Sequence, residues 1–247
     1  MKNVLAVSAF LAFGSISAQA ATISVTDFSK SAYDAAVGAM SEAIVEDFEN
    51  FGEGNIADGW SDSAVGAFSS AGGVGSGGTV TDDTSKGNFA GNDGSLLAIR
   101  DGNVYGRAST TSALSGDAGD DTFLDSNDTF GISWVASLGG KAFNRILLTL
   151  TDAAEFGATM RITVGDSVYE ATSLGNANPQ IVDIRFASAV TVANILFEHD
   201  KNGNAVRNDG FSLDDIALSA VPLPAGAWLL LSGFGALSLM RRRRRVA

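Results

Sequence analysis

Aspartate and glutamate are the residues of this chain that could do chemistry, because it has no cysteine and His199 is its only histidine. It therefore offers no thiol nucleophile, no zinc cluster and no evident partners for a catalytic serine. The 28 acidic side chains leave two chemistries open, coordination of a hard cation and glycoside hydrolysis by a carboxylate pair. The sequence does not bring two carboxylates to a defined separation, so we expect no enzymatic activity.

Four acidic residues form the best candidate cation site. Asp47 and Glu49 lie on an early predicted strand, and Asp214 and Asp215 lie on the last one. First and last strands are often neighbours in β-sandwiches, and carboxylates on adjacent strands repel one another unless a cation intervenes. Hard oxygen ligands suit Ca²⁺. We therefore predict structural calcium at Asp47, Glu49, Asp214 and Asp215, with solvated surface acids as an equally weighted alternative.

Two other acidic segments are weaker candidates. The run Asp117–Asp128 packs five aspartates into twelve residues, a pattern that solvated loop acids explain somewhat better than calcium does. Asp200–Asn204 has the first three ligand positions of a calcium loop. It then has Ala205 where an EF-hand needs glycine and Phe211 where it needs glutamate. The segment is therefore not an EF-hand.

Sugar binding would require an exposed aromatic ring that stacks on a pyranose face. Trp134 lies at a strand position that should face the core, and Trp228 lies in the C-terminal segment that we expect to be removed with the tail. Trp60 is therefore the possible sugar platform, with Tyr105 as a second choice. A single tryptophan in a loop is more often an anchor that holds the loop to the core, and we favour that interpretation.

The elements that must position these residues are predominantly strands. Phe28–Glu49 predicts a short helix, which Ser31 could cap, followed by a strand. The glycine-rich segment Gly52–Gly94 predicts long loops with short edge strands at Ala64–Ser69 and Gly77–Thr81. Regular strand patterns then cover Ser95–Arg100, Val104–Thr110, Thr129–Ala136, Phe143–Asp152, Thr159–Gly165, Ser167–Thr172, Gln180–Ala187, Val190–Glu198 and Gly210–Ser219.

Many short strands separated by turn residues favour a single antiparallel β-sandwich. Gly165-Asp166 separates two of these strands and predicts a hairpin turn. In the last strand, Phe211 and Leu213 have the opposite parity to Ile216 and Leu218. Both pairs can face the core only if a β-bulge lies at Asp214-Asp215.

The N-terminus has the pattern of a Sec signal peptide. A weakly basic start precedes the apolar segment Val4–Ile16, and Ala18-Gln19-Ala20 fits the small-x-small cleavage rule. We expect residues 1–20 to be removed and residues 21–220 to form the domain. Without both terminal segments, ten basic and 28 acidic side chains remain, a net charge near −18. Such a charge disfavours nucleic acid and anionic lipid as partners and favours cations.

Residues 221–247 have three physically distinct parts. The segment Val221, Pro222, Leu223, Pro224 and Ala225 should be extended, because proline fixes φ and removes a donor. The segment that follows, up to Met240, is uncharged, and we expect it to form a short transmembrane helix. It would span roughly 24 Å, which is short of a hydrocarbon core of about 30 Å. The basic cluster Arg241, Arg242, Arg243, Arg244 and Arg245 would hold this end on the cytoplasmic side.

This tail resembles the VPLPA variant of the PEP-CTERM sorting signal of Gram-negative bacteria, whose bearers are substrates of exosortase-type membrane transpeptidases. Val45-Glu-Asp-Phe-Glu49, Phe130-Gly-Ile-Ser-Trp134 and Asn208–Ile216 also resemble segments of such surface proteins. The resemblance implies a jelly-roll-like sandwich, passage through the Sec translocon and an inner-membrane precursor. It further implies exosortase processing and release to the cell surface or extracellular matrix.

We therefore predict a non-enzymatic exported surface or matrix protein. A carbohydrate-binding module acting on exopolysaccharide is the first alternative, for which an exposed aromatic platform would be the sign. A glycan hydrolase is the second alternative, for which two facing carboxylates in a cleft would be the sign.

Overall fold

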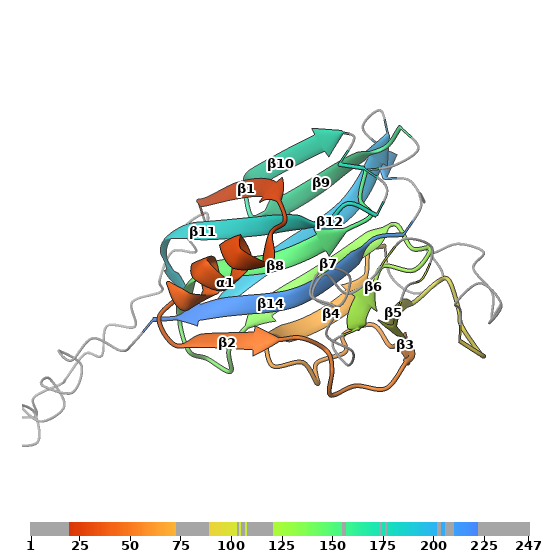
Figure 1. Ribbon diagram of the computed structural model, residues 1–247, viewed down its shortest axis with the longest axis horizontal. Helices are drawn as coiled ribbons and strands as arrows, with labels where there is room; N and C mark the ends of the chain where they lie inside the picture. Colours follow the sequence, from red (N-terminus) through yellow and green to blue (C-terminus); the bar gives the residue numbers. More distant parts are fainter. Residues whose placement is uncertain are drawn as a thin grey trace, which may run out of the picture.

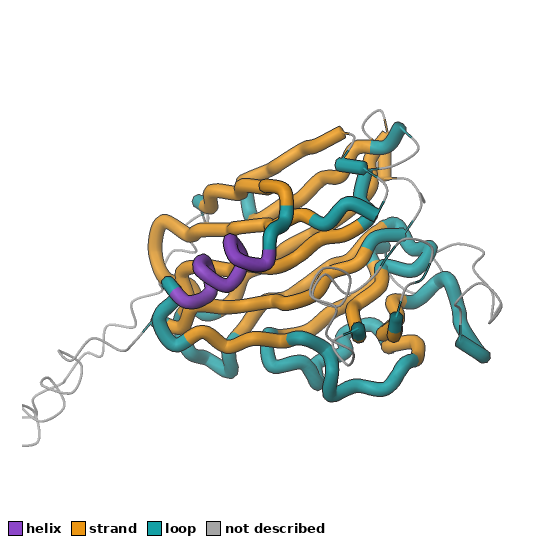
Figure 2. The backbone as a smooth tube through the Cα atoms, viewed as in Figure 1, coloured by secondary structure: helices purple, strands orange, loops and turns teal. Residues whose placement is uncertain are grey.

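The computed structural model describes residues 20–72, 89–102, 104, 107, 121–154, 157–172, 174–175, 177–201, 204–205 and 210–221. Two antiparallel sheets pack face to face, with one short helix on the outside (Figure 1). Strands dominate the described chain (Figure 2). The prediction of an all-β antiparallel sandwich is thereby confirmed.

The larger sheet has eight strands and contains the last strand near its middle. Its order is β1 (Ala21–Asp27), β11 (Gln180–Val190), β8 (Phe143–Thr151), β14 (Ser212–Ala220), β6 (Thr122–Asp125), β5 (Leu97–Asp101) and β3 (Gly54–Ile56). The eighth strand, β2 (Ala43–Glu46), also pairs with β14. Strand β2 is therefore a direct neighbour of the last strand. The prediction that Asp47 and Glu49 lie on this early strand was wrong, because β2 ends at Glu46 and both residues follow it.

The smaller sheet has six strands. Its order is β10 (Ser167–Thr172), β9 (Thr159–Val164), β12 (Val192–Lys201), β7 (Gly131–Ser137) and β4 (Gly66–Ser70), and β13 (Asn204–Ala205) pairs with β12. The predicted hairpin at Gly165-Asp166 is confirmed, since Val164 and Ser167 face each other across a two-residue turn. Gly165 has φ +57°, a conformation that glycine adopts without steric cost.

The core lies between the two sheets, where alternate residues of each strand meet. In β7, Ile132, Trp134 and Ala136 are fully buried. The Trp134 ring stacks on Phe68 with centroids 5.4 Å apart, and its indole N–H donates to the Val65 carbonyl at 3.1 Å. This bond satisfies the indole donor, which would otherwise lose its hydrogen bond to water on burial.

Helix α1 (Lys30–Gly38) covers the outer face of the larger sheet (Figure 1). Its buried Tyr33 packs in a small cluster with Leu147, Ile181 and Ala217. The predicted cap was wrong. Ser29, not Ser31, is the N-cap, because its hydroxyl accepts from the Ala32 amide at 3.2 Å.

The predicted bulge in β14 is confirmed. Asp214 faces Thr149 and Ala217 faces Leu147, so β14 uses one residue more than β8 between the two pairs. Asp215 has φ +50°. The extra residue restores the inward orientation, and one core cluster holds Phe211, Leu213, Ile216 and Leu218.

Several predicted features lie outside the described residues. These are the signal peptide up to Gln19, the strand at Gly77–Thr81, Tyr105, Trp228, the sorting residues from Pro222 onward and the terminal arginines. Most of the predicted strand Val104–Thr110 also lies outside them, although an isolated bridge joins Val104 and Arg107. Among the residues that are described, no helix is long and apolar enough to cross a membrane.

Candidate functional site

The acidic residues predicted to bind calcium are only partly brought together. Antiparallel pairing of β2 with β14 places Glu46 opposite Ile216. Glu49 then points to β6, where its carboxylate accepts from the Thr122 amide at 2.7 Å and from the Thr122 hydroxyl at 3.2 Å. This carboxylate ties the chain after β2 to β6.

Asp47, Asp214 and Asp215 are all near enough to Tyr33 for their charges to act on it. Burial raises the Tyr33 pKa, and the negative charges of Asp215, Asp214 and Asp47 raise it further. The Tyr33 hydroxyl donates to the Asp215 carbonyl, and Asp214 Oδ1 accepts from the Asp215 amide at 2.7 Å. In the part of the chain that is described, no three His, Cys, Asp or Glu side chains are arranged to hold a metal ion.

Trp60 lies at the edge of the core in a cluster of aromatic rings. Its ring centroid is 4.8 Å from that of Phe51, 6.2 Å from that of Phe68 and 6.4 Å from that of Phe48. Trp60 is half-buried, and its backbone bridges to Phe68 of β4. These contacts favour the loop-anchor interpretation over the sugar platform.

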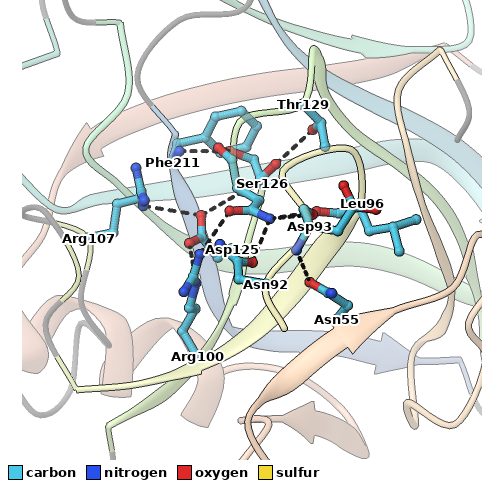
Figure 3. Close-up of polar contacts among 11 residues, drawn as sticks. Asn55, Asn92, Asp93, Leu96, Arg100, Arg107, Asp125, Ser126, Thr129 and Phe211 are labelled. Carbon is cyan, nitrogen blue, oxygen red and sulfur yellow. Dashed lines mark hydrogen bonds and ion pairs between the residues drawn. The ribbon is translucent and has the colours of Figure 1, made fainter. Parts of the chain in front are cut away.

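A buried charged network lies at the junction of β5, β6 and β14 (Figure 3). Arg100 Nε donates to Asp125 Oδ2 at 2.8 Å, and Arg107 Nε lies 3.1 Å from Asp125 Oδ1. All three side chains are at most 2% exposed. Burial of two guanidinium groups and one carboxylate is costly unless they stay paired.

Asn127 extends this network to the loop before β5. Its Nδ2 group lies within hydrogen-bonding distance of the Asn92 side chain and of the Asp93 and Leu96 carbonyls, while its Oδ1 accepts from Arg100 at 2.8 Å (Figure 3). These contacts fix the 92–96 loop against the turn after β6. The network therefore holds these loops in place.

The network was missed in the sequence. Asp125 belongs to the acidic run Asp117–Asp128, which predicted either solvated acids or calcium. The structure places Thr122–Asp125 in strand β6 with Asp125 fully buried. The two apolar residues Phe123 and Leu124 within the run were the available signal.

An open recess of about 610 Å³ lies on the outer face of the smaller sheet. Strands β9, β10 and β12 supply the residues that line it, which are Arg161, Thr163, Val168, Glu170 and Glu198. These residues are brought together by strand register, since Arg161 faces Glu170 on one side and Glu198 on the other. Val168 is 56% exposed.

Arg161 is the centre of this recess. Its Nε and Nη2 groups donate to Glu170 Oε1 at 2.9 and 2.7 Å, and its Nη1 group lies 3.3 Å from Asp200 and 3.7 Å from Glu198. The hydrogen bond with Glu170 raises the Arg161 pKa. The recess thus presents a fixed guanidinium and the carboxylates of Glu170 and Glu198, beside the apolar side chain of Val168.

The histidine is not placed for general-base chemistry. His199 is 3% exposed on the inner face of β12, and its Nε2 accepts from the Ala154 amide at 3.1 Å. Burial lowers its pKa to about 4. Its accessible lone pair is therefore already engaged by the backbone.

Comparison with known proteins gives little further information. No family model matches the chain, and no curated protein matches it. Among solved structures, it is similar to the catalytic domain of a GH87 alpha-1,3-glucanase in complex with nigerose, at 11% identity and a TM-score of 0.29. A variant of that domain in complex with tetrasaccharides gives 10% identity and the same TM-score. The match covers 52% of this chain and 27% of either glucanase chain.

Proposed function

We propose that this chain is a non-enzymatic, exported surface or extracellular-matrix protein that an exosortase-type enzyme processes at its C-terminal tail. The observation that carries the proposal is where the sandwich begins and ends. Strand β1 begins at Ala21, directly after the expected signal-peptidase site, and β14 ends at Ala220, directly before the Val221–Ala225 motif. The sandwich occupies the interval between the two predicted signals.

The backbone contacts at these two boundaries support the same division. Ala21 is the first residue of β1 to pair with β11, where it faces Phe186. At the other end, the Val221 amide donates to the Ala142 carbonyl at 2.7 Å. The domain therefore reaches the first residue of the proposed sorting motif with no linker between them.

A double substitution of Pro222 and Pro224 by alanine tests the sorting proposal. Alanine would let the apolar helix extend through the motif, which removes the extended segment that a protease groove needs. We expect the variant to accumulate as an unprocessed membrane-bound precursor, measured by cell fractionation and by the mass of the released protein. Cleavage and release like those of wild type would disprove the sorting proposal.

The terminal arginines give an independent test. Replacement of Arg241, Arg242, Arg243, Arg244 and Arg245 by serine removes the cytoplasmic charges that fix the orientation of a short span. We expect impaired retention or inversion of the precursor, measured by protease accessibility in spheroplasts. Normal retention of the serine variant would show that the arginines are not an anchor.

Carbohydrate binding is a second candidate function, favoured by the recess around Arg161. Neighbouring sugar hydroxyls are donors and acceptors at once, and a guanidinium beside carboxylates can complement both roles. Val168 offers an apolar surface for the C–H groups of a pyranose ring. The carboxylates Glu170 and Glu198 would repel an acidic chain, so this candidate is specific for neutral exopolysaccharide.

A glycan array with and without EDTA tests this candidate. Thr163 lies in the recess, whereas Thr172 is an exposed residue of β10 that is not among those lining it. Replacement of Thr163 by arginine should fill the recess and abolish binding, and the same change at Thr172 should not. Binding that survives Thr163→Arg would place the sugar site elsewhere, for example at Trp60.

A further inference from the structure

Strand β1 lies at one end of the larger sheet and pairs on one side, with β11 (Figure 1). The register of this pair is regular over Ala21–Asp27. Just outside these bounds, the Ala187 amide donates to the Ala20 carbonyl, and the Phe28 amide donates to the Pro179 carbonyl. Hydrogen-bonded pairs alternate along an antiparallel ladder, so the even-numbered residues of β1 bond to β11. The odd-numbered residues therefore turn their amides and carbonyls away from the sheet.

Most of these outward backbone groups are unsatisfied. At the start of the strand, Ser167 Oγ accepts from the Ala21 amide at 3.1 Å and donates to the Ala21 carbonyl at 2.8 Å. The outward amides and carbonyls of Ile23 and Val25 have no hydrogen-bond partner in the described parts of the chain. A row of unpaired backbone groups along a strand edge is a template for another strand.

The outermost strands β3 and β4 are treated differently, because neighbouring loops bond to their free edges. On β3, the Asn55 side chain donates to the Gly91 carbonyl at 2.9 Å and accepts from the Asp93 amide at 3.3 Å. On β4, the Phe68 amide donates to the Trp60 carbonyl at 2.8 Å. Strand β1 also has no proline, lysine or bulge, the other devices that protect an edge from pairing.

The side chains of β1 are self-complementary about Ser24. If two copies of the strand pair antiparallel around this residue, Thr22 faces Thr26, Ile23 faces Val25 and Ser24 faces its own copy. The three hydroxyl side chains are exposed, whereas Ile23 and Val25 pack against the core. Hydroxyl pairs and β-branched pairs both stabilise neighbouring strands. This register also opposes the outward backbone groups of Ile23 to those of Val25.

The charge distribution permits the same contact. Residues 21–220 have a net charge near −18, so two copies repel one another in general. The segment Ala21–Thr26 is uncharged, and Asp27 would face Ala21 of the second copy. By contrast, the edge of β10 has the exposed Glu170, with Asp166 in the turn before it. Pairing at β1 brings no two acidic side chains face to face.

We propose that β1 is a dimer interface, at which β1 of a second copy of this chain adds to the larger sheet as an antiparallel neighbour. The two-fold axis passes through Ser24, and the two larger sheets become one continuous sheet. Both copies use the same surface, as in other isologous dimers. The interface goes beyond the proposed sorting and does not require processing of the tail.

Single cysteines test the interface in the full-length chain, which has no cysteine of its own. Two Ser24→Cys copies would face each other in a non-hydrogen-bonded pair with Cα atoms about 4.5 Å apart, within the range of a disulfide. We expect mild oxidation to yield a covalent dimer that a reducing agent separates. Thr172→Cys, at an exposed position on β10, is the matched control and should stay monomeric.

Two further cysteine variants test the register. Thr22→Cys alone should cross-link poorly, because the two copies of residue 22 lie about 13 Å apart along the strands. The same holds for Thr26→Cys alone. An equimolar mixture of the two variants should form the covalent dimer, since Thr22 faces Thr26.

A charge exchange at Ser24 tests whether the dimer depends on this contact. Ser24→Lys places two ammonium groups face to face and should raise the dimer Kd about fivefold or more. An equimolar mixture of Ser24→Lys with Ser24→Glu should restore association, and Thr172→Lys should leave it unchanged. Sedimentation velocity of the full-length proteins in detergent measures these changes.

Three results would overturn the dimer interface. They are the absence of a covalent Ser24→Cys dimer, equal cross-linking of Ser24→Cys and Thr172→Cys, and association that does not respond to Ser24→Lys. The last would mean that another surface, such as the predicted transmembrane tail, holds the copies together. Adding Pro222→Ala and Pro224→Ala to the Ser24→Cys protein should leave cross-linking unchanged. A failure of the sorting proposal is thus distinguishable from a failure of the dimer interface.

Discussion

At the scale of single residues, His199 is the side chain whose ionisation should have the clearest effect on stability. It is buried in the core, its Nε2 accepts from the Ala154 amide, and its ring meets Phe211 edge-on with centroids 5.2 Å apart. Protonation would remove the acceptor and would place a charge in apolar surroundings. The folded protein therefore holds this imidazole neutral.

The pKa of His199 predicts a loss of stability in mild acid. The folded value is about 4 and the unfolded value about 6.5, so the unfolded chain takes up a proton first. The contribution of neutral His199 to the free energy of unfolding is fully present above pH 6.5. It is lost as the pH falls to 4, and the loss amounts to at most about 3 kcal/mol. Urea unfolding of wild type and His199→Gln between pH 7 and 4.5 measures this loss as a change in the stability difference between the two proteins. Glutamine is the right comparison because it keeps a hydrogen-bond acceptor but does not titrate. A difference that does not vary with pH would contradict the prediction.

The buried carboxylate of Asp125 should be far more important for stability than an exposed one. Asp125→Asn leaves Arg100 and Arg107 in the protein interior without the charge they share, which should cost about 3 to 5 kcal/mol. Glu170→Gln breaks the more exposed bond to Arg161 and should cost less than about 1 kcal/mol. Midpoints of chemical denaturation compare the two variants. Equal losses would show that the buried network contributes no special stability.

At the scale of elements, strands with a clear alternation were predicted from the sequence. The alternation of Ile132, Trp134 and Ala136 predicted β7, and the parity change in the last strand predicted its bulge. The agreement has a physical cause, because burial of one face imposes a period of two on the sequence. Such a signal is local and needs no knowledge of which strands are neighbours.

Some strands and the recess could not be predicted in this way. Strand β1 alternates, with Ile23 and Val25 packed against the core, but it was not predicted; it directly follows the predicted signal peptide. Strand β3 has only three residues and β13 only two, and β6 lies within an acidic run. The recess depends on the register that sets Glu198 beside Arg161, which residues far apart in sequence determine jointly.

The bulge of β14 gives a prediction at this scale. Asp215 has φ +50°, which glycine adopts freely and a β-branched residue adopts only with strain. We expect Asp215→Gly to change stability by less than about 1 kcal/mol, and Asp215→Val to cost more than about 1 kcal/mol. Thermal unfolding measures both. If valine is tolerated as well as glycine, the positive φ at the bulge is not a constraint.

At the scale of the whole molecule, excess negative charge is the main electrostatic property of residues 21–220. Several basic side chains are engaged within this segment, since Arg100 and Arg107 are buried with Asp125, and Arg145 pairs with Asp183. The remaining acids repel one another, which favours expansion of the chain and attracts cations. Exported calcium-binding modules often have a Kd of about 10⁻⁴ to 10⁻³ M. Calcium at millimolar concentration would then offset part of the negative charge of these acidic side chains.

We therefore predict that calcium stabilises residues 21–220. At a concentration ten times the Kd, binding adds about 1.4 kcal/mol, or roughly 3 to 6 °C in the unfolding temperature of a domain this size. Thermal unfolding in EDTA and in millimolar CaCl₂, with MgCl₂ as control, measures the shift.

Variants locate the calcium site. Asp214→Asn combined with Asp215→Asn should remove the shift in unfolding temperature if the site is near Tyr33. Glu49→Gln should not remove it, because that carboxylate already binds Thr122. A shift that persists in the double variant would indicate that calcium binds at Asp117–Asp128 instead. An unfolding midpoint of the wild-type protein that is the same in EDTA and in CaCl₂ would refute stabilising calcium.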